Sequence, residues 1–182
     1  MHDRTALTSV LLLAIAATLP ACSQEPQPEA SQKSVGNETL AAAMAGNEKV
    51  SGMSKAMQET GLAQVFDGSA SYTVLAPSND ALAAMEQQQA LTDEEDRALL
   101  AAVLREHVLP GALTPDDIEN AIEVQDGAVS MQTMGDGIMR FAKDGERLTV
   151  TDQDGRTAIV TGTPILASNG VVIPIDGVLK QP

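Results

Sequence analysis

The stretch that most constrains the fold is Ser71 to Met85, which reads SYTVLAPSNDALAAM. Residues 72–76 alternate β-branched, aromatic and small apolar side chains, a pattern typical of a half-buried strand. Pro77 ends that strand because proline lacks the amide hydrogen that a central strand donates. The Ser-Asn-Asp that follows at 78–80 offers side-chain oxygens to the first free amides of a helix. The sequence therefore predicts a strand, a corner and a helix.

Composition limits both the core and the partners. The chain has 182 residues, 43% of them hydrophobic and 20% charged, which suits one globular domain with short accessory segments. Only 2% are aromatic, so aliphatic side chains and the eight methionines have to fill the core. The formal net charge of −14 repels phosphate backbones, and few rings are present to stack on bases. We therefore expect no nucleic-acid partner.

The first 21 residues are typical of a signal peptide. An apolar run at 10–17 is too short to span a bilayer, and the segment ends in Leu-Pro-Ala-Cys at 19–22. Cys22 is the only cysteine, which excludes an intramolecular disulfide, and its setting resembles a bacterial lipobox. We expect residues 1–21 to be cleaved and Cys22 to carry lipid, such as palmitate. A secretory signal with an incidental cysteine is the alternative.

Residues 22–35 are predicted to be a disordered tether. The segment is rich in Gln, Pro, Ser and Glu and has no apolar face to bury. Several acyl chains on Cys22 would anchor the protein firmly, because one chain alone gives only marginal binding. We therefore expect an exported, lipid-anchored protein of the bacterial cell envelope, in the outer membrane or facing the periplasm.

Two helices are predicted before the first strand, at 37–45 and 50–59, separated by Gly-Asn. Met53 and Met57 recur at helical spacing in the second helix and are expected to pack in the core. Paired thioethers also suit Cu(I), and Met131 with Met134 offers a second such pair, so soft-metal capture is an alternative interpretation.

Central helices are predicted on either side of His107. Thr92 and Glu95 form a capping box for a helix whose apolar side leads to His107. The acidic side chains of this first turn interact favourably with the positive end of the helix dipole. Thr114 and Pro115 then have the residue types of a second helix start.

From residue 121 onwards the pattern predicts an antiparallel meander. Asp-Gly supplies the backbone angles of tight hairpins, and it occurs at 126–127, 136–137, 144–145 and 154–155. The chain closes with Asn169-Gly170 as a turn and a buried apolar run at 171–179. Pro174 in that run indicates an edge or bulged position.

Taken together, YTVLAPSNDAL at 72–82, LREHVLPG at 104–111 and NGVVIPIDGVL at 169–179 resemble the fasciclin domain family. The resemblance covers residues 36–182. It implies an α+β fold, a fasciclin-like antiparallel β wedge with packed N-terminal and central helices. Two departures are Glu106, where the family has Tyr before the histidine, and Ile173, where many members have His.

The resemblance also supplies candidate binding or structural positions, Asn79, His107 and Asp176. His107 lies on an apolar helix face, so we expect a buried imidazole tied to a backbone or carboxylate partner, with a binding or pH-responsive role as the alternative. Asp176 is expected to bond inward to a backbone group or to His107. Variable loops, such as Gln87-Gln88-Gln89, are equally plausible binding surfaces.

Catalysis finds little support in the sequence. After removal of residues 1–21, His107 is the only histidine, and neither a Gly-x-Ser-x-Gly elbow nor a phosphate-cradling glycine loop with lysine is present. We expect no enzyme, no cofactor and no metal site, although a carboxylate-dependent glycan-acting enzyme remains a distant alternative.

The function expected from these features is an envelope-anchored binding module, which the resemblance implies serves cell adhesion, surface association or matrix contact. Its partners would be the membrane, through the lipid, and an unknown protein or polysaccharide. A periplasmic small-ligand or metal-binding protein is the alternative.

Overall fold

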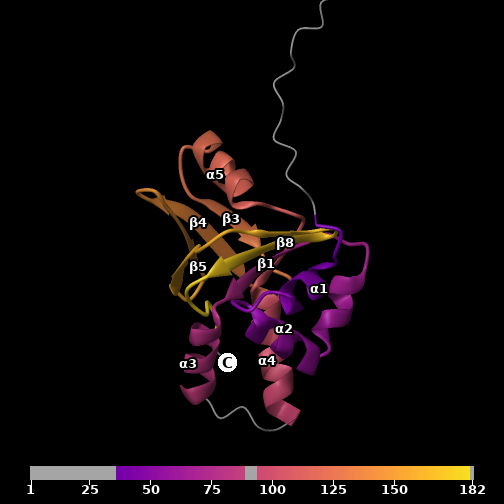
Figure 1. Ribbon diagram of the computed structural model, residues 1–182. Helices are drawn as coiled ribbons and strands as arrows, with labels where there is room; N and C mark the ends of the chain where they lie inside the picture. The colour runs from indigo at the N-terminus through magenta and orange to yellow at the C-terminus, as the bar shows by residue number, and fades with distance from the viewer. Residues whose placement is uncertain (1–35, 89–93, 181–182) are drawn as a thin grey trace, which may run out of the picture. The chain divides into compact units, whose positions relative to one another are not determined.

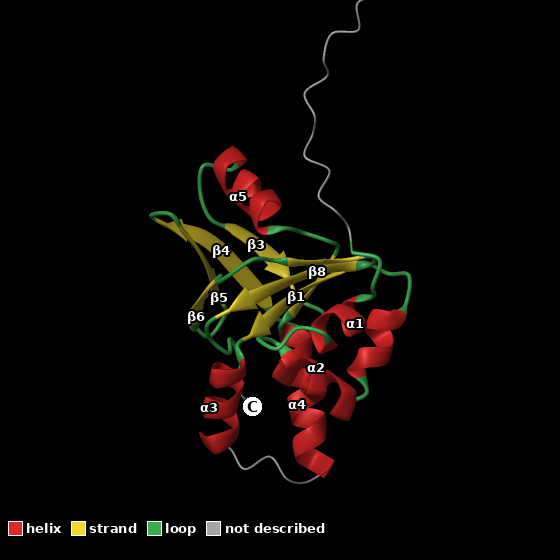
Figure 2. Cartoon of the chain, in the orientation of Figure 1, coloured by secondary structure: helices red, strands yellow, loops and turns green. Residues whose placement is uncertain are grey.

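The computed structural model describes residues 36–88 and 94–180. Within these ranges, two four-stranded sheets are packed with helices (Figures 1 and 2). The helices are α1 (Leu40–Ala45), α2 (Ser51–Glu59), the 3-10 helix η1 (Leu62–Asp67), α3 (Asn79–Gln88), α4 (Glu94–Glu106) and α5 (Pro115–Val124). The strands are β1 (Tyr72–Pro77), β2 (Val108–Pro110), β3 (Val129–Gln132), β4 (Ile138–Asp144), β5 (Arg147–Thr151), β6 (Thr157–Ile159), β7 (Ile165–Ala167) and β8 (Gly170–Ile175). The predicted α+β class is confirmed.

The first sheet has the strand order β2-β1-β8-β7, and β1 and β8 at its centre run parallel over six residue pairs. The sequence predicted an antiparallel wedge, but this central pair is parallel while the outer pairs are antiparallel, so the sheet is mixed. Both faces of the central strands are buried, which explains the near-continuous apolar runs in their sequences. One face, with Val74 and Val172, packs on α1, α2, η1, α3 and α4, and the other, with Leu75 and Ile173, packs on the second sheet.

The second sheet is the predicted meander, in the order β3-β4-β5-β6, with every neighbouring pair antiparallel. Three of the four Asp-Gly dipeptides lie between paired strands, as predicted. The prediction for Asp126-Gly127 is wrong, since these residues follow α5. Asp126 has φ 51°, and Gly127 N donates to Ile122 O at 3.1 Å, a left-handed helix ending rather than a hairpin.

Helix starts agree with their capping residues where the structure describes them. Thr114 accepts from Asp117 N, Asp117 bonds back to Thr114 N, and Pro115 is the first helical residue. The N-terminal helix is shorter than the predicted 37–45, because Thr39 caps it and Glu38 O accepts from Ser168 N beside β7. The predicted capping residue Thr92 lies outside the described residues, as does the greater part of the polar run at 87–93.

Pro174 lies in a central strand, yet its missing amide is tolerated. It pairs with Ala76 of β1 on one side. On the other side β7 has already ended, because its pairing reaches only to Val172, and Thr161 N donates to Pro174 O at 2.8 Å. The predicted edge position is therefore local, limited to the stretch of β8 that β7 does not cover.

Candidate functional site: a cleft at the carboxyl ends of β1 and β8

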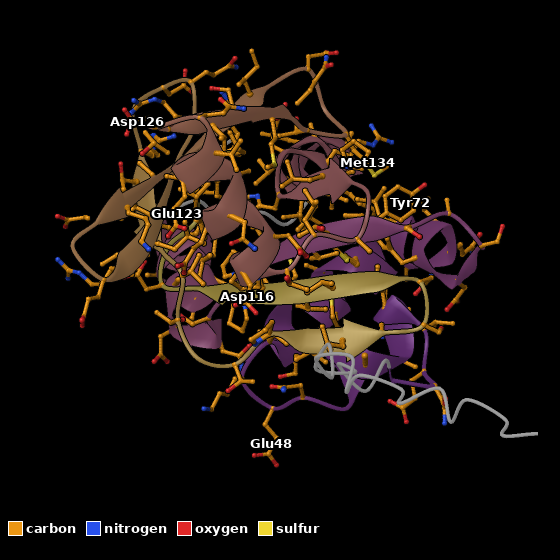
Figure 3. The ribbon with its side chains drawn as sticks, turned by 90° about the horizontal axis from the view of Figure 1, so that it is seen from above. Glu48, Tyr72, Asp116, Glu123, Asp126 and Met134 are labelled. Atoms are coloured by element: carbon orange, nitrogen blue, oxygen red, sulfur yellow. The ribbon has the colours of Figure 1, made fainter. Side chains whose placement is uncertain are left out.

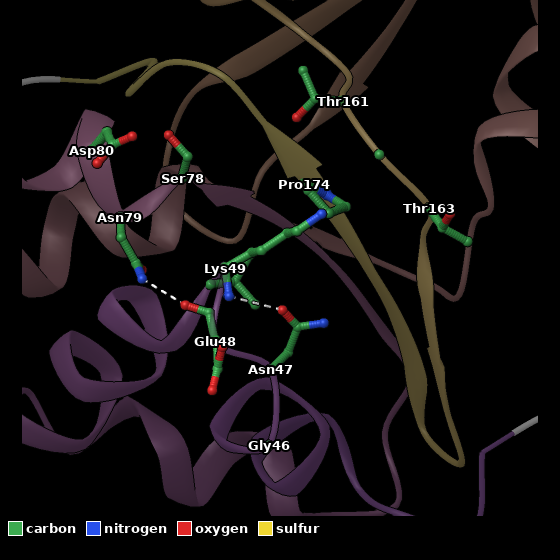
Figure 4. Close-up of a pocket in the computed structure, with 12 residues that line it drawn as sticks. Gly46, Asn47, Glu48, Lys49, Ser78, Asn79, Asp80, Thr161, Thr163 and Pro174 are labelled. Atoms are coloured by element: carbon green, nitrogen blue, oxygen red, sulfur yellow. Dashed lines mark hydrogen bonds between the residues drawn. The ribbon is translucent and has the colours of Figure 1, made fainter.

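An open cleft of about 690 Å³ lies where β1 and β8 end (Figure 4). Three segments form it: the connection between α1 and α2, the first residues of α3, and the connection between β6 and β7. Only the first residues of α3 follow one of these strands, whereas the other two segments connect helices or strands elsewhere in the chain and are more than 100 residues apart. The cleft therefore forms only when folding brings these distant segments to the end of the sheet where β1 and β8 finish.

Asn79 forms one wall of the cleft and joins α3 to α2. Its Oδ1 accepts from Gly52 N at 2.9 Å, and its Nδ2 donates to Glu48 O at 2.6 Å, the contact drawn in Figure 4, and to Ser51 Oγ at 3.2 Å. The N-cap residue of α2, Val50, makes no side-chain capping hydrogen bond. Asn79 thus caps a different helix from the one in which it lies.

The prediction that residues 78–80 cap their own helix is correct for one of them. Ser78 Oγ accepts from Ala81 N at 3.3 Å, whereas the Asn79 side chain leaves α3 altogether. The residues next to α3 in the sequence do not predict that Asn79 caps α2, because its hydrogen-bond partners lie about thirty residues earlier in the chain.

The groups that face the open part of the cleft are polar. Lys49 is exposed, and Figure 4 shows its side chain extending across the cleft towards Pro174. Thr161 and Thr163 contribute exposed hydroxyls from the opposite wall. Among the side chains that the structure describes, at 36–85 and 96–180, no carboxylate lies within ion-pair distance of the Lys49 ammonium. The cleft therefore presents a cation and several neutral hydrogen-bonding groups to solvent.

His107 is 1% exposed and lies well inside the domain. Its Nδ1 is 2.9 Å from Val103 O, and its Nε2 is 3.0 Å from Leu179 N, which donates to it. Since Nε2 accepts, Nδ1 carries the proton and the ring is neutral. Burial lowers the pKa of His107, and the Val103 carbonyl and the nearby carboxylates of Glu106 and Asp152 only partly oppose that shift. The structure thus places His107 in the core rather than on a binding surface.

Asp176 is exposed and follows β8 directly. Its Oδ1 accepts from Ile159 N at 2.7 Å, and its own amide donates to Ile159 O at 3.1 Å. This agrees with the predicted tie to a backbone group, while the alternative partner, His107, bonds elsewhere. Asp176 therefore holds the end of β6 against the end of β8. Cys22, the predicted lipidation site, lies outside the described residues.

Glu106, the departure before the histidine, organises the β3–β4 turn. Its carboxylate accepts from Thr133 Oγ1 at 2.6 Å, Gly137 N at 3.1 Å and Asp136 N at 3.2 Å. A Cβ built on Gly135 or Gly137 would lie 2.3 or 2.2 Å from this carboxylate. The glycines therefore permit the close approach, a relationship that sequence analysis missed.

The methionines of both pairs pack in the hydrophobic core. Met53 and Met57 are 0% and 1% exposed in the core beneath the first sheet. Met131 and Met134 pack against different hydrophobic clusters, so their sulfur atoms serve different parts of the core. In the part of the chain that the structure describes, no three His, Cys, Asp or Glu side chains are grouped to hold a metal ion.

The architecture allows a comparison with known proteins. A family model described as the fasciclin domain matches residues 48–182. The chain belongs to the fasciclin domain family. This fasciclin domain is also similar to "Protein sll1483" of Synechocystis sp., at 32% identity over 150 residues that cover 79% of this chain and 74% of that protein.

Two further similarities involve longer proteins. Transforming growth factor-beta-induced protein ig-h3 of Sus scrofa is 27% identical over 124 residues, 68% of this chain but 16% of that protein. A solved FAS1 domain pair from the insect cell adhesion molecule Fasciclin I matches with a TM-score of 0.61 and 24% identity, over 75% of this chain and 46% of that one. The latter similarity shows the fold of this fasciclin domain.

Sequence analysis found the family positions but not the cleft. Asn79 was singled out and lies in its wall, while Lys49, Thr161 and Thr163 were missed. An exposed lysine between two helices and two threonines in a loop follow no periodicity or motif, so only the folded chain shows that they face one another.

Within residues 36–88 and 94–180, the helices are too short or too polar to cross a bilayer.

Proposed function

We propose that this chain is a non-enzymatic binding module, held at the cell envelope by lipid on Cys22, whose fasciclin domain makes adhesive or matrix contacts. The proposal depends mainly on one observation: the polar side chains of the family motifs form hydrogen bonds within the domain. This is true of Asn79, His107 and Asn169.

Asn169 illustrates the point most clearly. It is 7% exposed, its Oδ1 accepts from Leu40 N at 2.8 Å, and its Nδ2 donates to Phe66 O at 2.6 Å and Gly68 O at 3.0 Å. Such side chains join distant segments and have no free group for acid–base chemistry. The motifs therefore specify the fold, and recognition falls to the surface loops.

The name of one similar protein supports the adhesive role, because the structural match is a domain pair from an insect cell adhesion molecule. The lipobox-like leader and the polar segment at 22–35 support envelope anchoring. A small-ligand-binding role is the second candidate, because the cleft of about 690 Å³ is large enough for a small molecule.

A vesicle-binding experiment tests the module directly. The acylated full chain is reconstituted into lipid vesicles, and saturable retention is measured on intact cells and on a panel of envelope and matrix polymers at physiological salt. Vesicles that carry only the acylated peptide 22–35 are the control. We expect saturable retention that the control lacks; equal retention of both on every surface contradicts a binding module.

A further inference from the structure

The cleft and the point where the chain enters the described domain lie at different ends of β8. The chain enters the described domain beside the β7–β8 turn, where Gly36 N donates to Leu166 O at 3.2 Å and Ser168 N donates to Glu38 O at 2.8 Å. That turn precedes β8 (Figure 1), whereas the residue of β8 that lines the cleft, Pro174, is next to the last residue of the strand. The entry point and the cleft are thus at opposite ends of one strand.

Lys49 gives the cleft its one full positive charge among the described lining residues. Two carboxylates, those of Glu48 and Asp80, also border the cleft. Figure 3 shows Glu48 projecting outward from the domain, and Figure 4 shows its carboxylate directed away from the Lys49 side chain. Lys49 is therefore not neutralised from within and is available to an anionic group of a ligand.

The rest of the lining suits a ligand with many hydroxyl groups. Thr161 and Thr163 both donate and accept hydrogen bonds, and the carboxylate of Asp80 accepts them. A polyol supplies both donors and acceptors, so it satisfies this mixture, whereas an apolar ligand would leave the groups unpaired. Pro174 adds a small apolar surface to one side.

The charge balance favours a singly charged anionic group as the partner of Lys49. One lysine faces the cleft, and two acidic side chains stand at its border. A phosphate monoester carries between one and two negative charges near neutral pH and would meet repulsion that one ammonium does not offset. A carboxylate carries one charge and pairs with one ammonium.

We propose that this cleft binds uronic-acid units of an acidic polysaccharide, with Lys49 paired to the sugar carboxylate and the threonine hydroxyls bonded to the ring hydroxyls. The inference rests on the proposed function and deepens it, since it names the chemical class of the surface partner. The described lining residues include no aromatic ring on which a sugar could stack, so each cleft binds weakly. Many lipid-anchored copies facing one polymer raise the overall avidity.

Titration calorimetry on the full chain tests this assignment, with trigalacturonate as the probe. Its methyl ester removes the charge, and galactose 6-phosphate carries a phosphate at C6, where galacturonate carries its carboxylate. We expect trigalacturonate to bind at millimolar concentration or tighter, and both comparison ligands to bind at least about ten-fold more weakly, as the loss of one charge-assisted contact implies. No binding of trigalacturonate, or equal binding of either comparison ligand, overturns the assignment.

Two lysine variants give a matched comparison. Lys49→Gln is expected to weaken trigalacturonate binding about ten-fold, while Lys55→Gln should leave it within about two-fold, because one charge-assisted contact is lost only in the first. Lys55 is also exposed, but it lies on α2 and is paired with Glu59 at 3.7 Å. Equal affinities of the two variants overturn the role of Lys49.

The same variants separate this inference from the proposed function. Vesicles bearing Lys49→Gln that still bind cells and neutral polymers, but not polyuronate, support both proposals. Retention of Lys49→Gln vesicles on polyuronate at the wild-type level overturns the cleft assignment and leaves the binding module intact.

Discussion

The imidazole of His107 accepts a hydrogen bond at 3.0 Å from the backbone amide of Leu179, 72 residues further along the chain. The bond requires an unprotonated Nε2, since Nδ1 is already directed at Val103 O. It joins the end of α4 to the segment that follows β8. The C-terminal segment is therefore held by a group whose acceptor is lost on protonation.

Stability is expected to fall when the solution is acidified through the range where histidine titrates. Burial holds the folded-state pKa of His107 below its usual value of 6.5, so the unfolded chain binds the extra proton first. The contribution of His107 is fully present above pH 6.5 and is lost as the pH falls through the folded-state pKa. Urea unfolding from pH 7.5 to pH 4.5 measures this effect.

The control for this prediction is His107→Gln, which removes the titration. The carboxylates of Glu106 and Asp152 beside the ring are present in both proteins, so the difference between the two pH profiles isolates the histidine. Hydrogen exchange at the Leu179 amide is a second readout, and its protection factor should fall in wild type as the solution is acidified. Parallel stability profiles combined with unchanged Leu179 protection would contradict the prediction.

Removal of the Asn79 side chain should destabilise the junction of α2 and α3. Asn79→Ala deletes three hydrogen bonds and uncaps α2, which is expected to lower the free energy of unfolding by about 2 kcal/mol. Asn120→Ala, on the exposed side of α5, is the matched control and should change it by less than about 0.5 kcal/mol. Similar unfolding midpoints in denaturant for both variants would refute the role assigned to Asn79.

A double-mutant cycle tests the contact between Glu106 and the β3–β4 turn. Gly137→Ala places a methyl group 2.2 Å from the carboxylate and should cost about 1–3 kcal/mol of stability in the wild-type background. In a Glu106→Ala background the obstruction is gone, so the same change should cost at least about 1 kcal/mol less.

Gly127→Ala is the control for that cycle, because its Cβ would meet nothing nearer than Gln125 O at 4.0 Å. Its effect should be the same in both backgrounds. An equal cost of Gly137→Ala with and without Glu106 would show that the carboxylate does not occupy the turn in solution.

The lipid anchor is tested by Cys22→Ala. Without the thiol no acyl chain can be attached, so the exported domain should move from the membrane fraction to the soluble fraction on cell fractionation. Mass spectrometry of the wild-type N-terminus should show an acylated Cys22 as the first residue. Membrane association that survives the substitution would remove the lipid from the proposed function.

The sequence predicted correctly those parts of the fold that depend on residues close together in the chain. Thr114 with Pro115 starts a helix, Asp144-Gly145 closes a hairpin, and Tyr72 to Pro77 forms a strand followed by a helix, all as expected. Each depends on neighbours within a few residues, so the side chains by themselves select the backbone angles.

Asp126-Gly127 shows the limit of local patterns. The same dipeptide that closes hairpins elsewhere ends α5 here, because the preceding residues form a helix whose last carbonyls need a left-handed residue. Which use applies depends on the element before it, and a dipeptide does not encode that context.

The sequence alone determined the fasciclin resemblance, the aliphatic core, the capped helices and the meander, since these follow from composition, periodicity and turn residues. Only the tertiary structure decided that β1 and β8 pair in parallel, that Asn79 caps α2, that Glu106 occupies the turn at 133–137, and that Lys49 faces Thr161 and Thr163. These partners are separated by about 27 to more than 100 residues, and no short-range pattern specifies which distant groups meet once the core has closed.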